Sequence, residues 1–176
     1  MFRLEPNVIL VDIHDCVLGE AAKMAAHKTP LLHRAFSVFL YHKDKLLIQR
    51  RAFHKYHSGG LWANACCSHP HPGEKTLDSA NRRLYEELLI ENVALEEIFS
   101  FIYYYQFGQT LFEYEYDHVL LGEYAGNPLL NKAEVEEFKW ISFQELSQSL
   151  VNTPQNFAPW FLIAAPRVLE KIKEYR

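Results

Sequence analysis

The 176-residue sequence lacks a long apolar run, a surplus of basic residues and enough cysteines to cross-link a fold. A membrane-spanning helix needs roughly 20 apolar residues in succession, whereas Glu5, Asp12 and Asp15 interrupt the apolar amino terminus. The formal net charge is -4, so the chain offers no overall basic field to nucleic acid or to an anionic membrane surface. We therefore expect a cytoplasmic protein whose partners are neither nucleic acids nor membranes.

The cysteines are Cys16, Cys66 and Cys67, and three cysteines cannot all pair within one chain. Two of them are neighbours in a context without a secretion signal, so we expect free thiols. Adjacent side chains of an extended backbone point to opposite sides. We therefore expect one of Cys66 and Cys67 to pack in the core while the other faces a cleft.

Internal repeats, low-complexity tracts and linkers are also missing from the sequence. Hydrophobic residues make up 49% of the chain and charged residues 23%, which is ordinary globular composition. The length is sufficient for one domain with its own core. We predict a single domain over residues 1–176, with a monomer as the default oligomeric state.

Strand and helix patterns are mixed along the chain without regular alternation. Runs rich in β-branched and aromatic residues predict strands over 34–41, 46–51, 98–105, 111–123 and 138–143. The first two strands should form a hairpin through the polar residues 42–45. Helical patterns cover residues 73–91, 144–150 and 160–176. This mixture predicts an α+β fold or an α/β/α sandwich on a mixed sheet.

The helical pattern over residues 73–91 is the most regular of the three. Its apolar residues recur at helical spacing, at Leu77, Ala80, Leu84 and Leu88. Thr76 or Asp78 is the expected N-cap. In the last helix we expect a bend or a start near Pro166, because proline cannot donate a helical hydrogen bond.

The stretch EYEYDH at residues 113–118 alternates strictly. A strand would place Glu113, Glu115 and Asp117 on one face, and Tyr114, Tyr116 and His118 on the other. One interpretation is a solvated polar face over a core of tyrosines. The other is that two carboxylates on one face bind a metal ion, or that one is a base beside a ligand.

The chain has nine histidines, from which a metal site could be built. His27, His33 and His69 with Glu113 and Glu115 would combine three imidazoles with two carboxylates. Such donors suit zinc, manganese or iron(II) and are too rich in nitrogen for a dedicated magnesium or calcium site. Spacing alone does not bring them together, and a single histidine is more often structural or exposed.

A more specific pattern lies on the helix predicted over 73–91. Written from Ser68, it is Ser-x5-Glu-x7-Arg-Arg-Leu-x-Glu-Glu-x-Leu-Ile, which resembles the Nudix box G-x5-E-x7-R-E-U-x-E-E-x-G-U, where U is a bulky aliphatic residue. The matching residues are Glu74, Arg82, Leu84, Glu86, Glu87 and Ile90, and the departures are Ser68, Arg83 and Leu89.

Arg83 is the departure with chemical consequences. Nudix hydrolases use a carboxylate at this position to hold the metal ions that activate water. An arginine there removes a ligand and supplies a phosphate-binding fork, which predicts a diphosphate-binding scaffold that has lost hydrolysis. The plainer interpretation is a salt bridge between Arg83 and Glu87, four residues apart on a solvated helix face.

Several segments, in their order along the chain, resemble the type 1 isopentenyl-diphosphate isomerases. They are residues 25–40, 48–74 with its CCSHP motif, the degenerate Nudix box, 111–124 and 156–160. The match runs from about residue 8 to the final helix. The resemblance implies a Nudix-like α/β/α fold and the interconversion of isopentenyl and dimethylallyl diphosphate in isoprenoid synthesis.

The resemblance also implies roles for individual residues. It makes Cys67 and Glu115 the two acid/base groups, and it places the five-carbon chain against Trp160. It gives Tyr104 a hydrogen bond near Glu115, a role that Tyr103 or Tyr105 could take instead.

The remaining implied residues bind metal ions and the diphosphate. A divalent ion, manganese, zinc or magnesium, would have the ligands His27, His33, His69, Glu113 and Glu115. A magnesium ion on the substrate diphosphate would be held by Glu87. The diphosphate itself would bind Lys23, Arg51, Lys55 and Arg83.

The reaction suits these residue types. It adds a proton at one carbon and removes another two carbons away, with no carbonyl to stabilise a carbanion. Protonation first creates carbocation character, which needs a proton donor, an acceptor on the opposite face and a π-cloud. Cys67, Glu115 and Trp160 would supply these, although a tryptophan in apolar surroundings is more often a core residue. The alternatives are a Nudix hydrolase of a small diphosphate metabolite and a non-catalytic zinc-stabilised binding domain.

Overall fold

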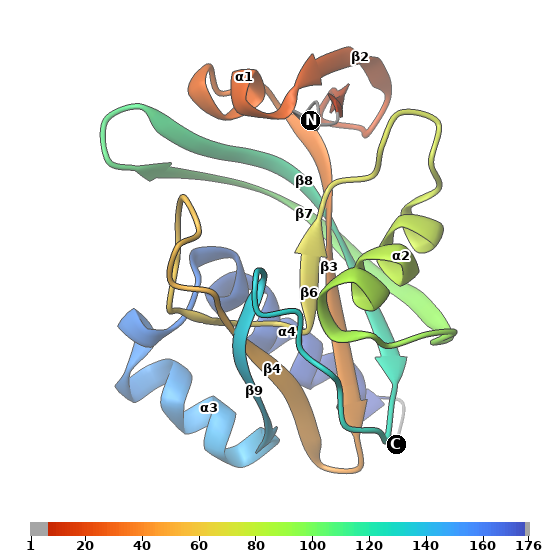
Figure 1. Ribbon diagram of the computed structural model, residues 1–176, viewed down its shortest axis with the longest axis vertical. Coiled ribbons are helices and arrows are strands. Elements are labelled where there is room, and N and C mark those ends of the chain that lie inside the picture. Colours follow the sequence, from red (N-terminus) through yellow and green to blue (C-terminus); the bar gives the residue numbers. More distant parts are fainter. Residues whose placement is uncertain (1–6, 175–176) are drawn as a thin grey trace.

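The computed structural model describes residues 7–174 and consists of a mixed β-sheet with helices on both faces (Figure 1). Predictions that involve Glu5 or residues 175–176 lie outside the described residues. The strands are β1 (Asn7–Val11), β2 (Val17–Ala22), β3 (His33–His42), β4 (Lys45–Arg51), β5 (Trp62–Ala63), β6 (Cys66–Ser68), β7 (Leu95–Phe107), β8 (Leu111–Glu123) and β9 (Val135–Ser142). The helices are α1 (Lys23–Lys28), α2 (Thr76–Leu88), α3 (Phe143–Asn152), the 3-10 turn Pro154–Asn156 and α4 (Pro159–Glu174).

Strand β3 lies at the centre of the sheet. It forms the expected hairpin with β4, is antiparallel to the short β6, and is parallel to β8. Ser37 pairs with Cys67 in β6 and with Val119 in β8, so these two strands lie on opposite sides of β3. The parallel register also sets His33 beside Glu115. Segments far apart in the sequence thus meet around β3.

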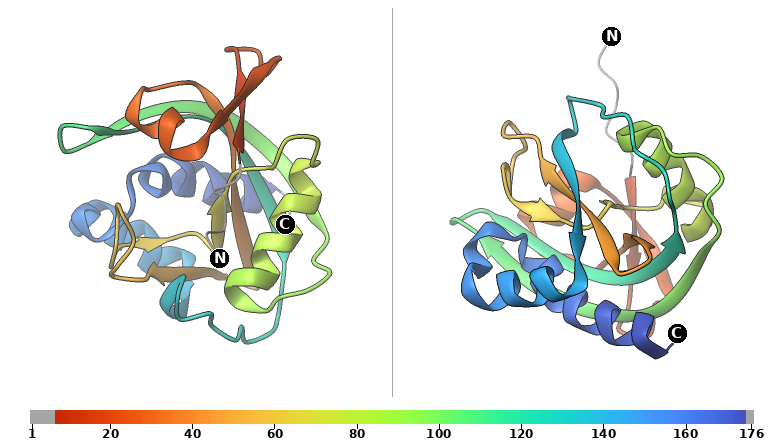
Figure 2. Two further views of the ribbon diagram at one scale, coloured as in Figure 1. Left: turned by 45° about the horizontal axis from the view of Figure 1, so that its top comes forward. Right: turned by 90° about the horizontal axis from the view of Figure 1, so that it is seen from below.

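Each face of the sheet is covered by a helix, as the view from below in Figure 2 shows. On one face, Phe36 and Val38 of β3 pack in a core with Leu84 of α2. On the other face, Phe39 stacks on Phe161 of α4 with ring centroids 5.8 Å apart. Alternate β3 residues thus enter different cores, as the side-chain alternation of a strand requires. The predicted α+β class and the α/β/α sandwich on a mixed sheet are confirmed.

The expected start of two helices differs from the structure. Helix α2 begins at Thr76, and its N-cap residue is Lys75, so the prediction of Thr76 or Asp78 as the N-cap is wrong. Helix α4 begins at Pro159, where a proline in the first turn leaves no helical hydrogen bond unmade. Pro166 lies inside this helix, so the expectation that the helix begins there is wrong, and the alternative of a bend there stays a prediction. None of the helices within residues 7–174 is long and apolar enough to cross a membrane.

Candidate active site

Most side chains that the sequence analysis assigned to a site line one pocket. Its wall includes residues of β6 and β8, the loop after β4 and the start of α4. The expected residues in this wall are Lys23, Arg51, Lys55, Cys67, His69, Arg83, Glu87, Glu113, Glu115 and Trp160. His27 and His33 do not line the pocket; they are fully buried, with ring centroids 5.6 and 4.9 Å from that of His69.

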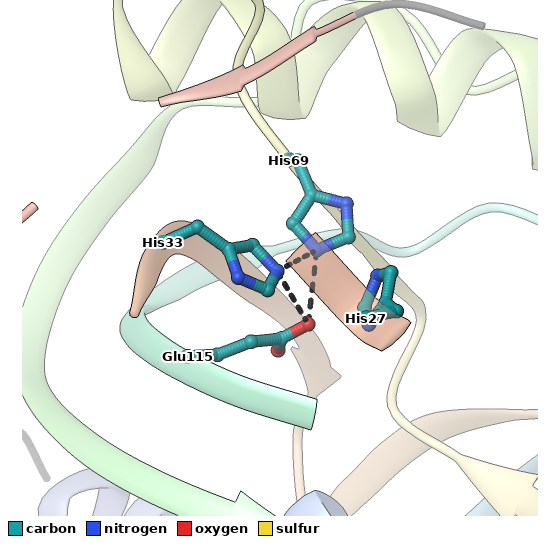
Figure 3. Close-up of side chains that lie close together, drawn as sticks. All are labelled: His27, His33, His69 and Glu115. Atoms are coloured by element: carbon teal, nitrogen blue, oxygen red, sulfur yellow. Dashed lines mark hydrogen bonds and ion pairs between the residues drawn. The ribbon is translucent and has the colours of Figure 1, made fainter. Parts of the chain in front are cut away.

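Three imidazoles and one carboxylate form a compact cluster next to this pocket (Figure 3). His27 belongs to α1, His33 begins β3, His69 follows β6 and Glu115 belongs to β8. One ligand atom from each residue lies within 4.8 Å of the others. His69 Nε2 is 2.9 Å from Oε1 of Glu115 and 3.2 Å from Nε2 of His33. These are the donors of a divalent transition-metal site.

Hydrogen bonds on the far side of two rings decide which nitrogen faces the cluster. Nδ1 of His33 lies 2.7 Å from the Leu31 carbonyl oxygen, and Nδ1 of His27 lies 2.8 Å from that of Phe112. Each Nδ1 must donate, because a carbonyl oxygen only accepts, and this leaves Nε2 of the neutral ring as an acceptor. Nε2 of His27 is buried and has no hydrogen-bond partner. A metal ion would satisfy that lone pair, so the residues fit a divalent ion.

Burial and neighbouring charges set the protonation states of the cluster, and they act differently on its members. Burial lowers the pKa of His69 to about 3 and also lowers the pKa of His27. Burial acts in the same direction on His33, but its hydrogen bond and charge attraction to Glu115 outweigh burial and raise its pKa. Burial would raise the pKa of Glu115, yet hydrogen bonds from His33 and His69 hold it well below its usual range. Glu115 is therefore a carboxylate, ready to act as a ligand.

Glu113, the other carboxylate of the expected ligand set, lies beside the cluster. Its Oε1 is 2.9 Å from Nε2 of His57, and the Tyr103 hydroxyl donates to its Oε2 at 2.6 Å. His57 is a pocket residue to which the sequence analysis assigned no role, although it lies in the segment 48–74 that carries the family resemblance. Four of the five expected ligands converge, and Glu113 remains a predicted fifth.

Tyr104 does not have the position that the sequence analysis expected. The hydroxyl of Tyr103, not that of Tyr104, lies near the Glu115 carboxylate, at 3.0 Å from Oε2. Tyr103 is 5% exposed, whereas Tyr104 is 53% exposed and packs edge-on against Tyr114. The β7–β8 register pairs Tyr103 with Glu115 and Tyr104 with Tyr114, so the two tyrosines point to opposite faces. The prediction for Tyr104 is therefore wrong, and Tyr103 takes its hydrogen bond.

The adjacent cysteines have the different surroundings that were predicted. Cys66 is fully buried in the core beneath α2, and Cys67 is half-buried in the pocket wall. Burial raises the pKa of both thiols, so Cys67 keeps its proton at neutral pH. An Nη1–H of Arg51 points at Sγ of Cys67 at 3.9 Å.

Carboxylates fix two basic side chains of the pocket, Arg83 and Lys55. Arg83 forms ion pairs with Glu86 at 2.6 Å, with Glu87 at 2.5 Å and with Glu134 at 3.5 Å. The predicted Arg83–Glu87 bridge is confirmed, although Arg83 lines the pocket and does not lie on an open helix face. Lys55 also pairs with Glu134. Glu87 is 4% exposed and accepts a second hydrogen bond from Gln49 at 3.0 Å.

The carboxylate face of β8 points into the protein. Glu113, Glu115 and Asp117 are 4%, 6% and 1% exposed, respectively. Ser37 donates a hydrogen bond of 2.7 Å to Asp117, and burial raises the pKa of Asp117 well above its usual range. The strict alternation is thus confirmed, and the interpretation as a solvated polar face is wrong.

Trp160 closes the pocket on the side of α4. It is 2% exposed, and its ring centroid lies 5.2 Å from the Arg51 guanidinium. The His57 ring meets it edge-on at 6.0 Å. Trp160 belongs to the α4-side core and to the pocket wall together, so it is a core residue with a face that a ligand can reach.

Comparison with known proteins gives a consistent set of relatives. A family model described as "NUDIX domain" matches residues 31–161. The isopentenyl-diphosphate Delta-isomerase 2 of Aromatoleum aromaticum is 46% identical, over 94% of this chain and 88% of the relative. The isopentenyl-diphosphate Delta-isomerase of Pectobacterium atrosepticum is 43% identical, over 92% and 90%. The isopentenyl-diphosphate Delta-isomerase of Streptomyces griseus is 39% identical, over 94% of this chain and 84% of the relative.

Solved structures share the fold at low sequence identity. A protein of Deinococcus radiodurans has a TM-score of 0.69 at 20% identity, over 84% of this chain and 90% of that one. A MutT NUDIX hydrolase from Burkholderia pseudomallei has a TM-score of 0.57 at 18% identity, over 79% and 96%. A likeness at this identity establishes the fold and leaves the chemistry to the site.

Proposed function

Because the chain belongs to the isopentenyl-diphosphate Delta-isomerase family within the Nudix superfamily, it interconverts isopentenyl and dimethylallyl diphosphate, and we propose that Cys67 and Glu115 transfer the two protons. One observation carries the proposal. A thiol from β6 and a carboxylate from β8, on strands at opposite sides of β3, line the same pocket. We propose that the thiol and the carboxylate face the two sides of a substrate bound in that pocket.

The resting protonation states supply one donor and one acceptor. Burial keeps the proton on Cys67 because it raises the pKa of the thiol, and hydrogen bonds from two histidines keep Glu115 ionised. An allylic shift needs both, since a proton is added at one carbon while another leaves from a carbon two bonds away. No electrons are gained or lost overall, so the reaction needs no redox partner.

Trp160 would stabilise the positive charge that forms between these transfers. The π-face of tryptophan attracts a cation without offering it a nucleophile. The Arg51 guanidinium lies 5.2 Å from the ring centroid, a contact of a cation with this ring that supports the proposed role. The diphosphate would bind Lys23, Arg51, Lys55 and Arg83, so that the small alkyl chain is held accurately between Cys67 and Glu115.

Metal ions would complete the site. His27, His33, His69 and Glu115 would hold a divalent ion, with Glu113 as a further ligand, and manganese, zinc or magnesium is proposed there. When bound, this ion would supply fixed positive charge that orients Glu115 and tunes its basicity. Glu87 would hold a magnesium ion on the substrate diphosphate. Metal analysis of the purified protein tests the first assignment, and magnesium binding measured with and without the diphosphate substrate tests the second.

The proton-transfer roles are tested by removing each group. Cys67→Ala and Glu115→Gln should each lower kcat by about a hundredfold to ten-thousandfold, the usual contribution of a general acid or base. Cys66→Ala is the matched control, because it removes a thiol from the α2-side core and should retain turnover. Formation of dimethylallyl diphosphate from isopentenyl diphosphate is the measurement. Substantial turnover by folded Cys67→Ala or Glu115→Gln would remove the mechanism.

The rival function is hydrolysis of a small diphosphate metabolite. Arg83 argues against it, because it occupies the Nudix-box position of a metal-binding carboxylate and forms ion pairs with Glu86 and Glu87. The same incubation separates the two functions, since a hydrolase would release phosphate and the isomerase would not.

We also propose that the protein acts in the cytoplasm as a monomer, without nucleic-acid or membrane partners. A reducing compartment keeps Cys67 as the thiol that the mechanism needs. The pocket wall is built from residues of one chain, and the net charge of -4 gives no attraction to anionic polymers or surfaces. Cell fractionation and light scattering of the purified protein are the tests.

A further inference from the structure

Asn64 is a fully buried residue between β5 and β6 whose side chain makes three hydrogen bonds. Its Nδ2 donates to the carbonyl oxygens of Val38 at 3.1 Å and of Cys66 at 2.6 Å. Its Oδ1 accepts from the indole N–H of Trp160 at 3.0 Å. These partners allow one orientation of the amide, because two carbonyls require donors and one indole N–H requires an acceptor.

The three bonds connect elements that come from distant parts of the sequence. Val38 and Cys66 are paired residues of β3 and β6, so the NH2 group of Asn64 holds the strand pair that carries Cys67. The oxygen of the same amide holds the first turn of α4, through Trp160. The amide is therefore a short rigid link between the strand that presents the thiol and the helix that presents the π-face.

From this link we infer that Asn64 is a positioning residue, which fixes the Trp160 ring relative to the Cys67 thiol. The inference rests on the proposed function, because it takes Cys67 and Trp160 as groups that act on the five-carbon chain. Asn64 does not line the pocket and acts through these two residues.

Burial alone does not require this arrangement. A phenylalanine at position 160 would fill the same apolar space and has no N–H to pair. Residue 64 would then not need an acceptor for the indole. A buried polar network in which every donor is satisfied instead selects one orientation of its members. The orientation matters here because a displacement of about 1 Å at a reacting centre can lower the rate on the order of a hundredfold.

The experiment is a double-mutant cycle with Trp160→Phe and Asn64→Ser. Trp160→Phe keeps an aromatic face and removes the N–H, and Asn64→Ser shortens the side chain so that it no longer reaches the indole. Trp140→Phe and Asn81→Ser are matched controls, because they make the same chemical changes outside the pocket wall. The readouts are kcat and KM for isopentenyl diphosphate, bound metal per chain and the thermal midpoint.

Each single variant should lower kcat by about ten- to a hundredfold, while KM and bound metal stay within about threefold of the wild type. In the Trp160→Phe background, Asn64→Ser should lower kcat by a smaller factor than in the wild type, because the bond to the indole is already absent and only the bonds to Val38 and Cys66 remain to be lost. If Asn64→Ser lowers kcat in the Trp160→Phe background by the same factor as in the wild type, the inference is overturned. Wild-type kcat in either single variant also overturns it. If Asn64→Ser does not fold, Trp160→Phe by itself is the test, and wild-type kcat in that variant overturns the inference.

Trp160→Ala separates failure of this inference from failure of the proposed function. If Trp160→Ala keeps wild-type kcat, Trp160 has no role in turnover and the proposed mechanism fails at that residue. If Trp160→Ala loses turnover while Trp160→Phe and Asn64→Ser retain it, the mechanism stands and the positioning role of Asn64 is rejected.

Discussion

The Tyr103 hydroxyl is shared by two carboxylates, at 2.6 Å from Glu113 and 3.0 Å from Glu115. Burial, followed by the charge of Glu113, raises the pKa of Tyr103 well above its usual value, so the hydroxyl keeps its proton. The single hydroxyl restrains the positions of both carboxylates. It therefore holds Glu115, the proposed acid/base group, in place. The side chain of Tyr104 takes no part, since it points to the outer face of the β7–β8 hairpin.

Tyr103→Phe should therefore lower kcat by about ten- to a hundredfold. The reason is that a hydrogen bond to a charged group contributes about 1.5–3 kcal/mol. Tyr104→Phe is the matched control and should leave kcat unchanged, because it removes an exposed hydroxyl. Steady-state kinetics on the two variants measures the difference. Equal losses would show that the register of the hairpin differs from the one described.

At this scale the sequence predicted which residue types share a face, but not which tyrosine meets Glu115. Alternation along β8 is local and follows from strand geometry. The pairing of Tyr103 with Glu115 depends on the turn near Gly108, which has a φ of 64° and lets Phe107 pair with Leu111. A turn assigned to residues 108–110 would have predicted the correct tyrosine.

At the scale of elements, Glu74 anchors the beginning of α2. Its two oxygens accept from Nε and Nη2 of Arg82 at 2.8 and 3.0 Å. The hydrogen bond from Arg82 lowers the pKa of Glu74 from an ordinary value of 4.5 to about 2. A carboxylate whose pKa is lowered by folding stabilises the folded state at any pH above its pKa in the unfolded chain. This contribution is lost as the pH falls through its pKa in the folded chain.

Glu74→Gln should lower the free energy of unfolding at pH 7 by about 1–3 kcal/mol, since one pKa unit corresponds to about 1.4 kcal/mol. The difference from the wild type should shrink between pH 4.5 and pH 2, the window set by the two pKa values. Urea denaturation at pH 7, 5, 4 and 3 measures it. A constant difference down to pH 3 would mean that Glu74 does not act through its charge.

Pro166 interrupts the hydrogen bonds of α4 at an exposed position. Proline has no N–H for the carbonyl four residues earlier, that of Leu162, and an internal proline costs a helix about 3 kcal/mol relative to alanine. Pro166→Ala should therefore raise the free energy of unfolding by about 1–3 kcal/mol. Chemical denaturation is the measurement, and the exposed Glu170→Ala in the same helix is the control. A destabilised Pro166→Ala would show that the helix is built around the proline.

Elements with a strong local period could be predicted, and those held by tertiary contacts could not. Helix α2 was predicted from Leu84 and Leu88, which repeat at helical spacing and are fully buried. The short strands β5 and β6 were missed because two or three residues show no period. Their pairing with β4 and β3 defines them.

At the scale of the whole molecule, the apolar side chains of residues 7–174 pack in two cores, one on each face of the sheet, and these contacts do not depend on a metal ion. Dialysis against a chelator should therefore abolish turnover while the helix and strand signals of circular dichroism persist. Added manganese, zinc or magnesium should restore activity, and the ion that does so identifies the working metal. Loss of the folded signal on chelation would instead support a metal-stabilised binding domain.

The molecule as a whole could be assigned to its family from motifs, but the assembly of its site required the topology. Cys67, Glu115 and Trp160 belong to three separate elements, and no spacing in the sequence gives the distances between them. Asn64 and His57 remained hidden for the same reason, since their partners are Trp160 and Glu113. The single-domain organisation over residues 1–176 stays a prediction.

The parallel pairing of β3 with β8 also constrains when the protein can begin to work. His33 is synthesised early, but its neighbour Glu115 follows only after β4 to β7 have been made. Contacts between residues so distant along a chain form late in folding, because the long intervening loop must close first. A ribosome-bound chain that ends before β8 should therefore carry three imidazoles without their carboxylate. The ability to capture a metal ion would thus mark the completion of folding.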